Sequence, residues 1–124
     1  MIKPGTILYG VKPEMIMCYL IAQSIFHEMG FGCVITSAVG KKHKKYSLHP
    51  VGYALDLRTK HIKSLSIKEQ IVEEMKKALP CCDIILEHVG GEQEHIHYEF
   101  DPKDDPVFQS HKKIYRETGS WPIN

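Results

Sequence analysis

The 124-residue sequence lacks a long apolar segment and has almost no excess of charge of either sign. Its longest apolar run, residues 15–22, is far shorter than the roughly 20 residues that a membrane-spanning helix needs. Lysine and arginine number 16 against 15 acidic residues, so the formal net charge of +1 gives no general attraction for nucleic acid or anionic membranes. We therefore expect neither as a partner, and any ligand must be recognised at a local site.

The sequence also lacks paired cysteines, and no signal peptide is expected. Cys81 and Cys82 are adjacent while Cys18 and Cys33 stand alone, and these are not the spacings of a disulfide scaffold or a zinc knuckle. We interpret all four as reduced thiols. Proline, glycine and charged residues interrupt the first part of the chain, which leaves no signal-peptide core and no cleavage site. We expect a protein that is cytoplasmic as synthesised.

What is present is an ordinary globular composition, with 43% hydrophobic and 25% charged residues. There is no repeat, linker or low-complexity tract, so residues 1–124 are expected to form one domain. The basic stretch "GKKHKKY" at 40–46 predicts an exposed loop between two strands.

Apolar spacing predicts three helices. The first begins at Pro13 and ends at Gly30, a natural carboxy-terminal cap. Ser66 and Glu69 have capping-box spacing and predict the start of the second. An aspartate followed by a proline predicts the last helix over residues 106–117.

Strand patterns lie between these helices. A short β-branched stretch predicts a strand over 32–37, and "GYALDLR" at 52–58 alternates as a strand does. Residues 83–100 resemble a hairpin that turns at Gly90 and Gly91. The fold class is therefore predicted as α+β, with a small, mostly antiparallel sheet flanked by helices.

Strand alternation gathers polar side chains on one face. It places His95, His97 and Glu99 on the face opposite Ile96 and Tyr98, which are expected in the core.

Asp56 likewise faces away from the leucines on either side of it. An isolated carboxylate in such apolar surroundings costs several kcal/mol, so a cation is expected beside it. His49 precedes it by seven positions, and imidazole and carboxylate groups are ligands that Zn²⁺ prefers. The other five histidines are interpreted as surface or hydrogen-bonded residues: His27, His43, His61, His88 and His111.

The stretch "SLHPVGYALD" at 47–56, followed by "EHIH" at 94–97, resembles a known family. It is similar to the zinc D-Ala-D-Ala carboxypeptidases and dipeptidases, to phage endolysins that cut peptidoglycan peptides, and to the zinc site of the hedgehog amino-terminal domain. The order of predicted elements also fits, and the resemblance implies a hedgehog/D-Ala-D-Ala-peptidase-like zinc fold.

The resemblance implies a role for each matching residue. His49, Asp56 and His97 would bind one Zn²⁺ ion, and Ser47 would help to hold the substrate. Glu94 would be the general base, at the family's Glu-x-x-His spacing. The residue matching His95 lines the site, where it would donate to a developing oxyanion.

Two features of the sequence do not fit the roles that the resemblance implies. By strict alternation Glu94 lies opposite His95 and His97, so a twist or bulge must turn it toward the metal. Glu92 is the second candidate for the general base, and Glu87 is the third. A turn at Gly90 and Gly91 would place Glu87 directly across from Glu94.

The second departure is a missing arginine. Relatives commonly carry one just after the strand serine, whereas this chain reads "TSAVGKKHKK". Lys41 or Lys42 would supply a positive charge there, but without the bidentate geometry of a guanidinium. The alternative is that this loop is only a solvated surface. Arg58 is expected to be a surface or supporting residue. The departure favours an endopeptidase over recognition of a free terminal D-Ala carboxylate.

The expected function is a zinc metallopeptidase that hydrolyses an amide bond in peptidoglycan stem peptides, as a carboxypeptidase or an endopeptidase. We expect a monomer whose partner is such a peptide, either a phage-type enzyme released to the cell wall or a cytoplasmic dipeptidase. Two alternatives remain: a hydrolytically inactive, zinc-stabilised binding module, and a closed site with His95 as fourth ligand that serves folding alone.

Overall fold

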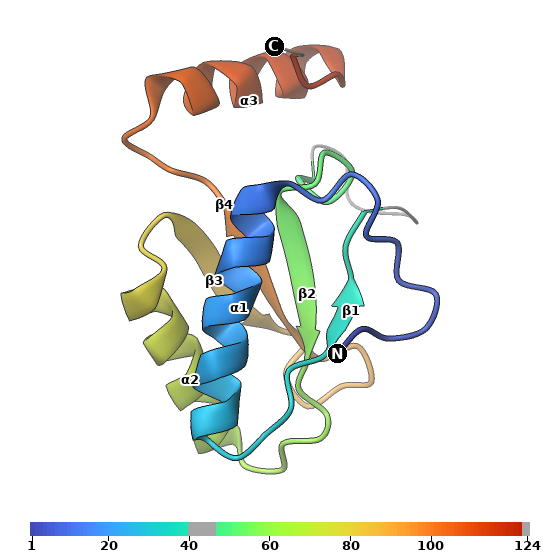
Figure 1. The fold of residues 1–124 in the computed structure, drawn as a ribbon, viewed down its shortest axis with the longest axis vertical. Coiled ribbons are helices and arrows are strands. Elements are labelled where there is room, and N and C mark those ends of the chain that lie inside the picture. The colour runs from blue at the N-terminus through green and yellow to red at the C-terminus, as the bar shows by residue number, and fades with distance from the viewer. Residues whose placement is uncertain (40–46, 123–124) are drawn as a thin grey trace.

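The computed structural model describes residues 1–39 and 47–122, and in these ranges three helices accompany one four-stranded antiparallel sheet (Figure 1). The strand order is β1-β2-β4-β3. The predicted α+β class is thereby confirmed. The elements are α1 (Pro13–Glu28), β1 (Ile35–Ser37), β2 (Ala54–Arg58), α2 (Leu65–Ala78), β3 (Cys82–Glu87), β4 (His95–Phe100) and α3 (Pro106–Thr118).

The helix boundaries follow local capping chemistry, with one correction. The Asp105 side chain accepts hydrogen bonds from the first amides of α3, and Gly119 ends that helix in the left-handed region, as predicted. The predicted capping box at Ser66 is wrong. Ser64 is the N-cap of α2, because its extended backbone lets its hydroxyl accept from the amide of Ile67.

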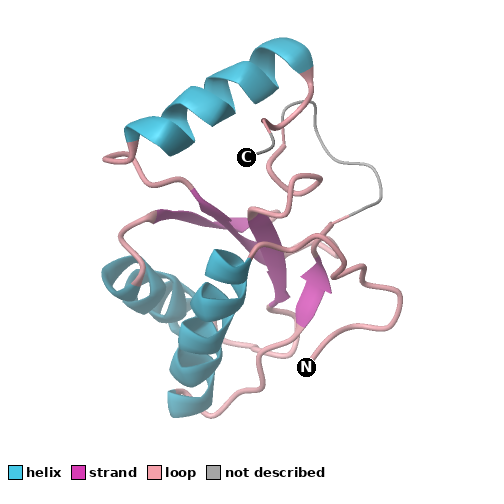
Figure 2. Cartoon of the chain, turned by 45° about the horizontal axis from the view of Figure 1, so that its top comes forward, coloured by secondary structure: helices cyan, strands magenta, loops and turns pink. Residues whose placement is uncertain are grey.

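The sheet has one apolar and one polar face, as alternation predicts. Helices α1 and α2 cover the apolar face (Figure 2), where Leu55, Leu57, Ile96 and Tyr98 are fully buried. The opposite face carries the polar side chains of β2 and β4, and no helix among the described residues covers it in these views. Burial therefore separates the core from a face that is free to bind a ligand.

The hairpin between β3 and β4 differs from the prediction. Glu87 pairs with His95 rather than with Glu94, so the predicted two-residue turn is wrong. Residues 88–94 form a longer loop, in which His88 and Gly90 take left-handed conformations with φ of 53° and 82°. This register places the Glu87 side chain beside that of His95.

Helix α3 lies beyond one end of the sheet (Figure 1) and is held there by an aromatic cluster. The Tyr53 ring lies 5.0 Å from that of Phe108 and 5.2 Å from that of Trp121. The Tyr115 hydroxyl also donates to the carbonyl oxygen of Ser47 at 2.6 Å. Helix α3 is thus tied to the segment that leads into His49.

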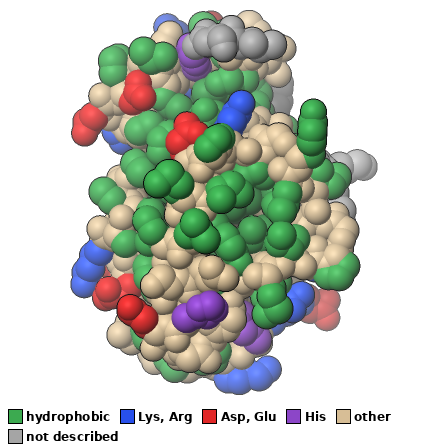
Figure 3. Space-filling model, in the orientation of Figure 1, with side chains coloured by type: hydrophobic (Ala, Val, Ile, Leu, Met, Phe, Trp, Pro, Cys, Tyr) green, Lys and Arg blue, Asp and Glu red, His purple; other side chains and the backbone are tan. Residues whose placement is uncertain are grey.

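Helix α1 is apolar on its outer side as well. Figure 3 shows hydrophobic side chains gathered on this face of the molecule, and four of them on α1 are at least 40% exposed: Ile16, Met17, Leu20 and Ile21. Among the described helices, none combines the length and apolar character needed to cross a bilayer.

Gly52 holds the turn that follows His49, and we predict that it tolerates no side chain. Its φ is +86°, and a Cβ atom there would lie 2.0 Å from the Gly10 carbonyl oxygen. We expect Gly52→Ala to lower the free energy of unfolding by about 3 kcal/mol or more, because left-handed strain and a backbone clash combine. Urea denaturation measures the change.

Gly90→Ala is the matched control for this substitution. Gly90 has a similar φ of +82°, but its Cβ would meet no atom within 4 Å. It should lose only about 1 kcal/mol, the cost of the left-handed backbone alone. Equal losses at the two glycines would contradict the clash.

Candidate metal centre

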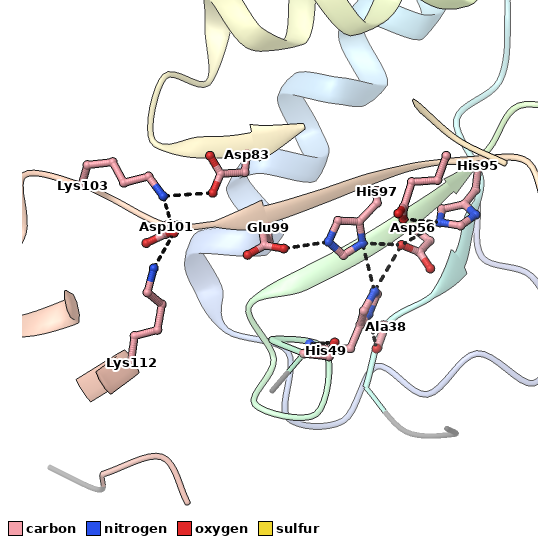
Figure 4. Close-up of polar contacts among 12 residues, drawn as sticks. Ala38, His49, Asp56, Asp83, His95, His97, Glu99, Asp101, Lys103 and Lys112 are labelled. Atoms are coloured by element: carbon pink, nitrogen blue, oxygen red, sulfur yellow. Dashed lines mark hydrogen bonds and ion pairs between the residues drawn. The ribbon is translucent and has the colours of Figure 1, made fainter. Parts of the chain in front are cut away.

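Three donor atoms converge on the polar face of the sheet (Figure 4). His49 Nε2 lies 3.2 Å from Asp56 Oδ1 and 3.3 Å from His97 Nδ1, and His97 Nδ1 lies 2.9 Å from Asp56 Oδ1. The motif resemblance implied that these three residues act as a set, and the structure brings their side chains together.

The register between β2 and β4 explains the positions of two of the three donor residues. Asp56 on β2 and His97 on β4 are directly paired across an antiparallel ladder, so their side chains leave the sheet side by side. His49 comes from the loop before β2, where its backbone amide donates to Ser47 Oγ at 3.1 Å. Its carbonyl accepts from the Gly52 amide at 3.0 Å, and its side chain is almost fully buried.

Each histidine has its second ring nitrogen occupied. His49 Nδ1 lies 2.8 Å from the Ala38 carbonyl oxygen, to which it donates. His97 Nε2 donates to Glu99 Oε1 at 2.9 Å. Such outer partners fix the ring orientation and direct the other nitrogen toward a metal. His49 Nε2 and His97 Nδ1 therefore face the centre.

The charges of the cluster are strongly coupled. Burial raises the pKa of Asp56, but hydrogen bonds with His49 and His97 outweigh it and hold that pKa well below its usual range. Burial lowers the pKa of His97, whereas hydrogen bonds with Asp56 and Glu99 raise it to about 10. The two carboxylates thus favour positive charge at this position, which a bound cation would also supply.

The donor set fits a small divalent cation. Tetrahedral ligands about 2.0–2.1 Å from a Zn²⁺ ion are separated from one another by about 3.3 Å. The three observed separations of 2.9–3.3 Å are close to this value. Two imidazoles and one carboxylate are also the ligand types of catalytic zinc sites.

His95 and Glu87 form a pair beside the cluster. His95 Nε2 lies 3.1 Å from Glu87 Oε1 and 3.7 Å from Asp56 Oδ1. His95 Nδ1 lies 2.7 Å from the Gln93 carbonyl oxygen. Both ring nitrogens therefore face hydrogen-bond acceptors. Glu87 was only a third choice as base from the sequence, yet its carboxylate lies beside the histidine of the site.

Glu94 is held away from the three donors. Its Oε1 accepts from the Thr59 hydroxyl and the Lys68 ammonium, and its Oε2 accepts from the Gly90 amide at 2.8 Å. The side chain is only 3% exposed. The expected turn of Glu94 toward the metal residues does not occur in this structure, because a buried ion pair with α2 holds its carboxylate.

We predict that this ion pair makes stability depend on pH. Burial raises the pKa of Glu94, but hydrogen bonds from Gly90, Lys68 and Thr59 lower it from 4.5 to about 2. A depressed native pKa contributes stability that is complete above pH 4.5 and lost as the pH falls to about 2. The displacement corresponds to about 3 kcal/mol.

Urea denaturation of wild type and Glu94→Gln at several pH values measures this contribution. The wild type should be the more stable protein at neutral pH, and the difference should shrink between pH 4.5 and pH 2. Glu69→Gln, at an exposed position on α2, is the control. A difference for Glu94→Gln that does not change with pH would contradict the ion pair as its source.

The remaining predicted site residues have different placements. Ser47 Oγ accepts from the His49 amide, so this serine supports the ligand loop. Lys41 lies outside the described residues. Glu92 is exposed in the loop between β3 and β4.

Glu99 is a site residue that had no assigned role in the sequence-based prediction. Alternation placed it on the face of His97, and that signal was sufficient to suggest a supporting carboxylate. A further acidic group, formed by Asp83, Glu99 and Asp101, is neutralised in part by lysines. Asp101 accepts from Lys112 at 2.7 Å and from Lys103, which also bonds Asp83 (Figure 4).

A hollow of about 660 Å³ adjoins the cluster on the side of Asp56 and His95. Its walls come from the amino-terminal segment, β1, β2 and the loop before β4. The site is thus open to a ligand larger than an ion.

No family model, no curated protein and no solved structure matches this chain.

Proposed function

We propose that the protein is a zinc metallopeptidase that hydrolyses an amide bond in peptidoglycan stem peptides. The observation that carries the proposal is the convergence of His49, Asp56 and His97, with donor atoms 2.9–3.3 Å apart. The two imidazoles are already oriented by Ala38 and Glu99, so little rearrangement is needed to hold a metal.

The metal would supply chemistry that the side chains lack. When bound, Zn²⁺ lowers the pKa of water to about 7 and polarises a carbonyl group. Three protein ligands leave a position for water or substrate, whereas a structural site uses four.

We assign the general base to Glu87 rather than to Glu94. Glu87 is partly exposed and adjoins His95, so it can take a proton from water and pass it to the leaving amine. Both oxygens of Glu94 accept hydrogen bonds, from Thr59, Lys68 and Gly90, whereas only Oε1 of Glu87 has a partner among the described residues, so Glu87 is the better placed to take a proton. His95 is positioned to donate to the oxyanion that develops on the scissile carbonyl.

The substrate class rests on the two sequence motifs. "SLHPVGYALD" and "EHIH" resemble those of peptidases that act on D-amino-acid-containing peptides. The fold proposed with them is the hedgehog/D-Ala-D-Ala-peptidase-like zinc fold, to which the antiparallel sheet and its flanking helices are suited.

A direct assay tests the function. The purified chain, loaded with one equivalent of Zn²⁺, is incubated with peptidoglycan fragments and with purified stem peptides, and released amines are quantified. We expect release that stops when a chelator removes the metal and resumes on adding zinc. Bound zinc without release from any peptide would contradict the peptidase.

One observation favours the alternative of an inactive, zinc-stabilised module. His95 Nε2 is only 3.7 Å from Asp56 Oδ1, so His95 is near enough to become a fourth ligand. X-ray absorption of the zinc-loaded protein distinguishes three histidine ligands from two. Three histidines together with no hydrolysis would establish the closed structural site.

A further inference from the structure

A row of paired residues runs across the sheet beside the metal centre, and two of its members, Arg58 and His95, line the hollow. Arg58 on β2 pairs with His95 on β4, and His95 pairs with Glu87 on β3. All three therefore rise from the polar face at one level, next to the level of Asp56 and His97. Arg58 lines the hollow together with Asp56 and His95.

The hollow carries more positive than negative charge available to a ligand. Three cations line it: Lys3, Arg58 and Lys60. Of the carboxylates in its wall, Asp56 belongs to the donor cluster and Glu94 is paired with Lys68. Glu92 alone is left to balance the three cations.

These cations have no acidic partners within the described part of the chain. No ion pair joins Lys3, Arg58 or Lys60 to a described carboxylate, whereas Lys68 and Lys112 have one each and Lys103 has two. Arg58 is partly exposed, and no carboxylate among the described residues forms an ion pair with its guanidinium. A planar guanidinium in that position is suited to bidentate binding of a carboxylate.

The distances along the strand suit a short peptide. Arg58 is two residues beyond Asp56 on β2, which separates their Cα atoms by about 6.6 Å. One or two residues of extended peptide span about 3.5–7 Å. A carboxylate one or two residues from the scissile amide can therefore reach Arg58 while the amide lies at the metal centre.

We propose that Arg58, assisted by Lys60 and Lys3, binds a carboxylate of the substrate on this side of the metal centre. This inference rests on the proposed peptidase function and narrows its substrate to peptides with a carboxylate near the cut. It assigns to Arg58 a role that the sequence had left to Lys41 or Lys42. The carboxylate is either the terminal one of the peptide or that of an acidic side chain.

Calorimetric titration of the zinc-loaded Glu87→Gln chain tests the inference without turnover. The probes are diacetyl-L-lysyl-D-alanyl-D-alanine, its carboxy-terminal amide, and acetyl-L-alanyl-D-glutamic acid with its terminal carboxylate amidated. At least one carboxylate-bearing probe should bind about tenfold more tightly than the uncharged amide, since a charge-assisted pair is lost in the amide. Which probe is preferred identifies the source of the carboxylate.

Substitutions then assign the preference to a residue. In the Glu87→Gln chain, adding Arg58→Gln should abolish the preference for the carboxylate-bearing probe without changing the zinc content. Adding Arg58→Lys instead should retain part of that preference. Arg116→Gln, an exposed arginine on α3, should leave it intact. A preference that survives Arg58→Gln would overturn the inference, because the carboxylate would then bind the metal or another group. The absence of any preference in the parent would overturn it equally.

Failure of this inference differs from failure of the proposed function. If the wild-type chain hydrolyses a peptide but its carboxylate preference does not depend on Arg58, only the role of Arg58 is rejected. If the carboxylate preference depends on Arg58 but no peptide is hydrolysed, the carboxylate site stands and the proposed peptidase function is rejected.

Discussion

Replacing His49 or Asp56 with alanine is expected to weaken zinc binding by far more than a hundredfold and to abolish hydrolysis. Loss of an outer-shell partner costs about 10–100-fold in metal affinity, and a lost ligand costs more. Each substitution also removes a member of a tightly coupled cluster, in which His49 Nε2 lies 3.2 Å from Asp56 Oδ1. Competition with a chromophoric chelator measures the affinity, and metal analysis gives the stoichiometry.

Matched controls separate ligand loss from general damage. His27→Ala removes an exposed histidine from the last turn of α1, and Asp104→Ala removes an exposed carboxylate before α3. Both variants should bind zinc as the wild type does. Zinc affinity that is unchanged in His49→Ala, or equally weak in His27→Ala, would show that the cluster is not the binding site.

The second large effect is expected from Glu87→Gln, which should retain zinc and lose hydrolysis by about a hundredfold to ten-thousandfold. That range is the usual contribution of a positioned general base. The amide keeps the size of the side chain and can still contact His95, so folding and metal content should be preserved. Zinc stoichiometry and kcat on a stem peptide are measured together.

Glu94→Gln provides the opposing case. Its carboxylate is committed to Lys68, so its replacement should lower stability while kcat remains within a few-fold of the wild type in folded protein. The family spacing predicted the reverse, with Glu94 as the base. Loss of kcat in Glu94→Gln but not in Glu87→Gln would restore that sequence-based assignment. Assays at a temperature well below unfolding keep the two effects separate.

Some of this site follows from sequence because it depends on neighbouring residues alone. Strand period two places Asp56 opposite Leu55 and Leu57, and it places His95 and His97 opposite Ile96, wherever the strands lie. Burial of those apolar residues confirms the pattern. The N-cap at Asp105 is equally local, since a carboxylate reaches the amides two and three residues onward.

Other features needed the packed chain. The two left-handed residues in the loop before β4 shift the hairpin register, so Glu87 rather than Glu94 meets the site. The partners of Glu94 are far from it in sequence, with Lys68 on α2 and Thr59 after β2. No motif spacing predicts either contact.

The sequence by itself determined the fold class and the polar face of the sheet, and its motif resemblance singled out His49, Asp56 and His97. Tertiary structure decided which glutamate adjoins that set and which cation lines the hollow beside it. The physical reason is how far apart in the sequence the interacting residues lie. Alternation and capping are fixed within a few residues of chain, whereas the partner of a charged side chain depends on loops and helices that packing brings from elsewhere.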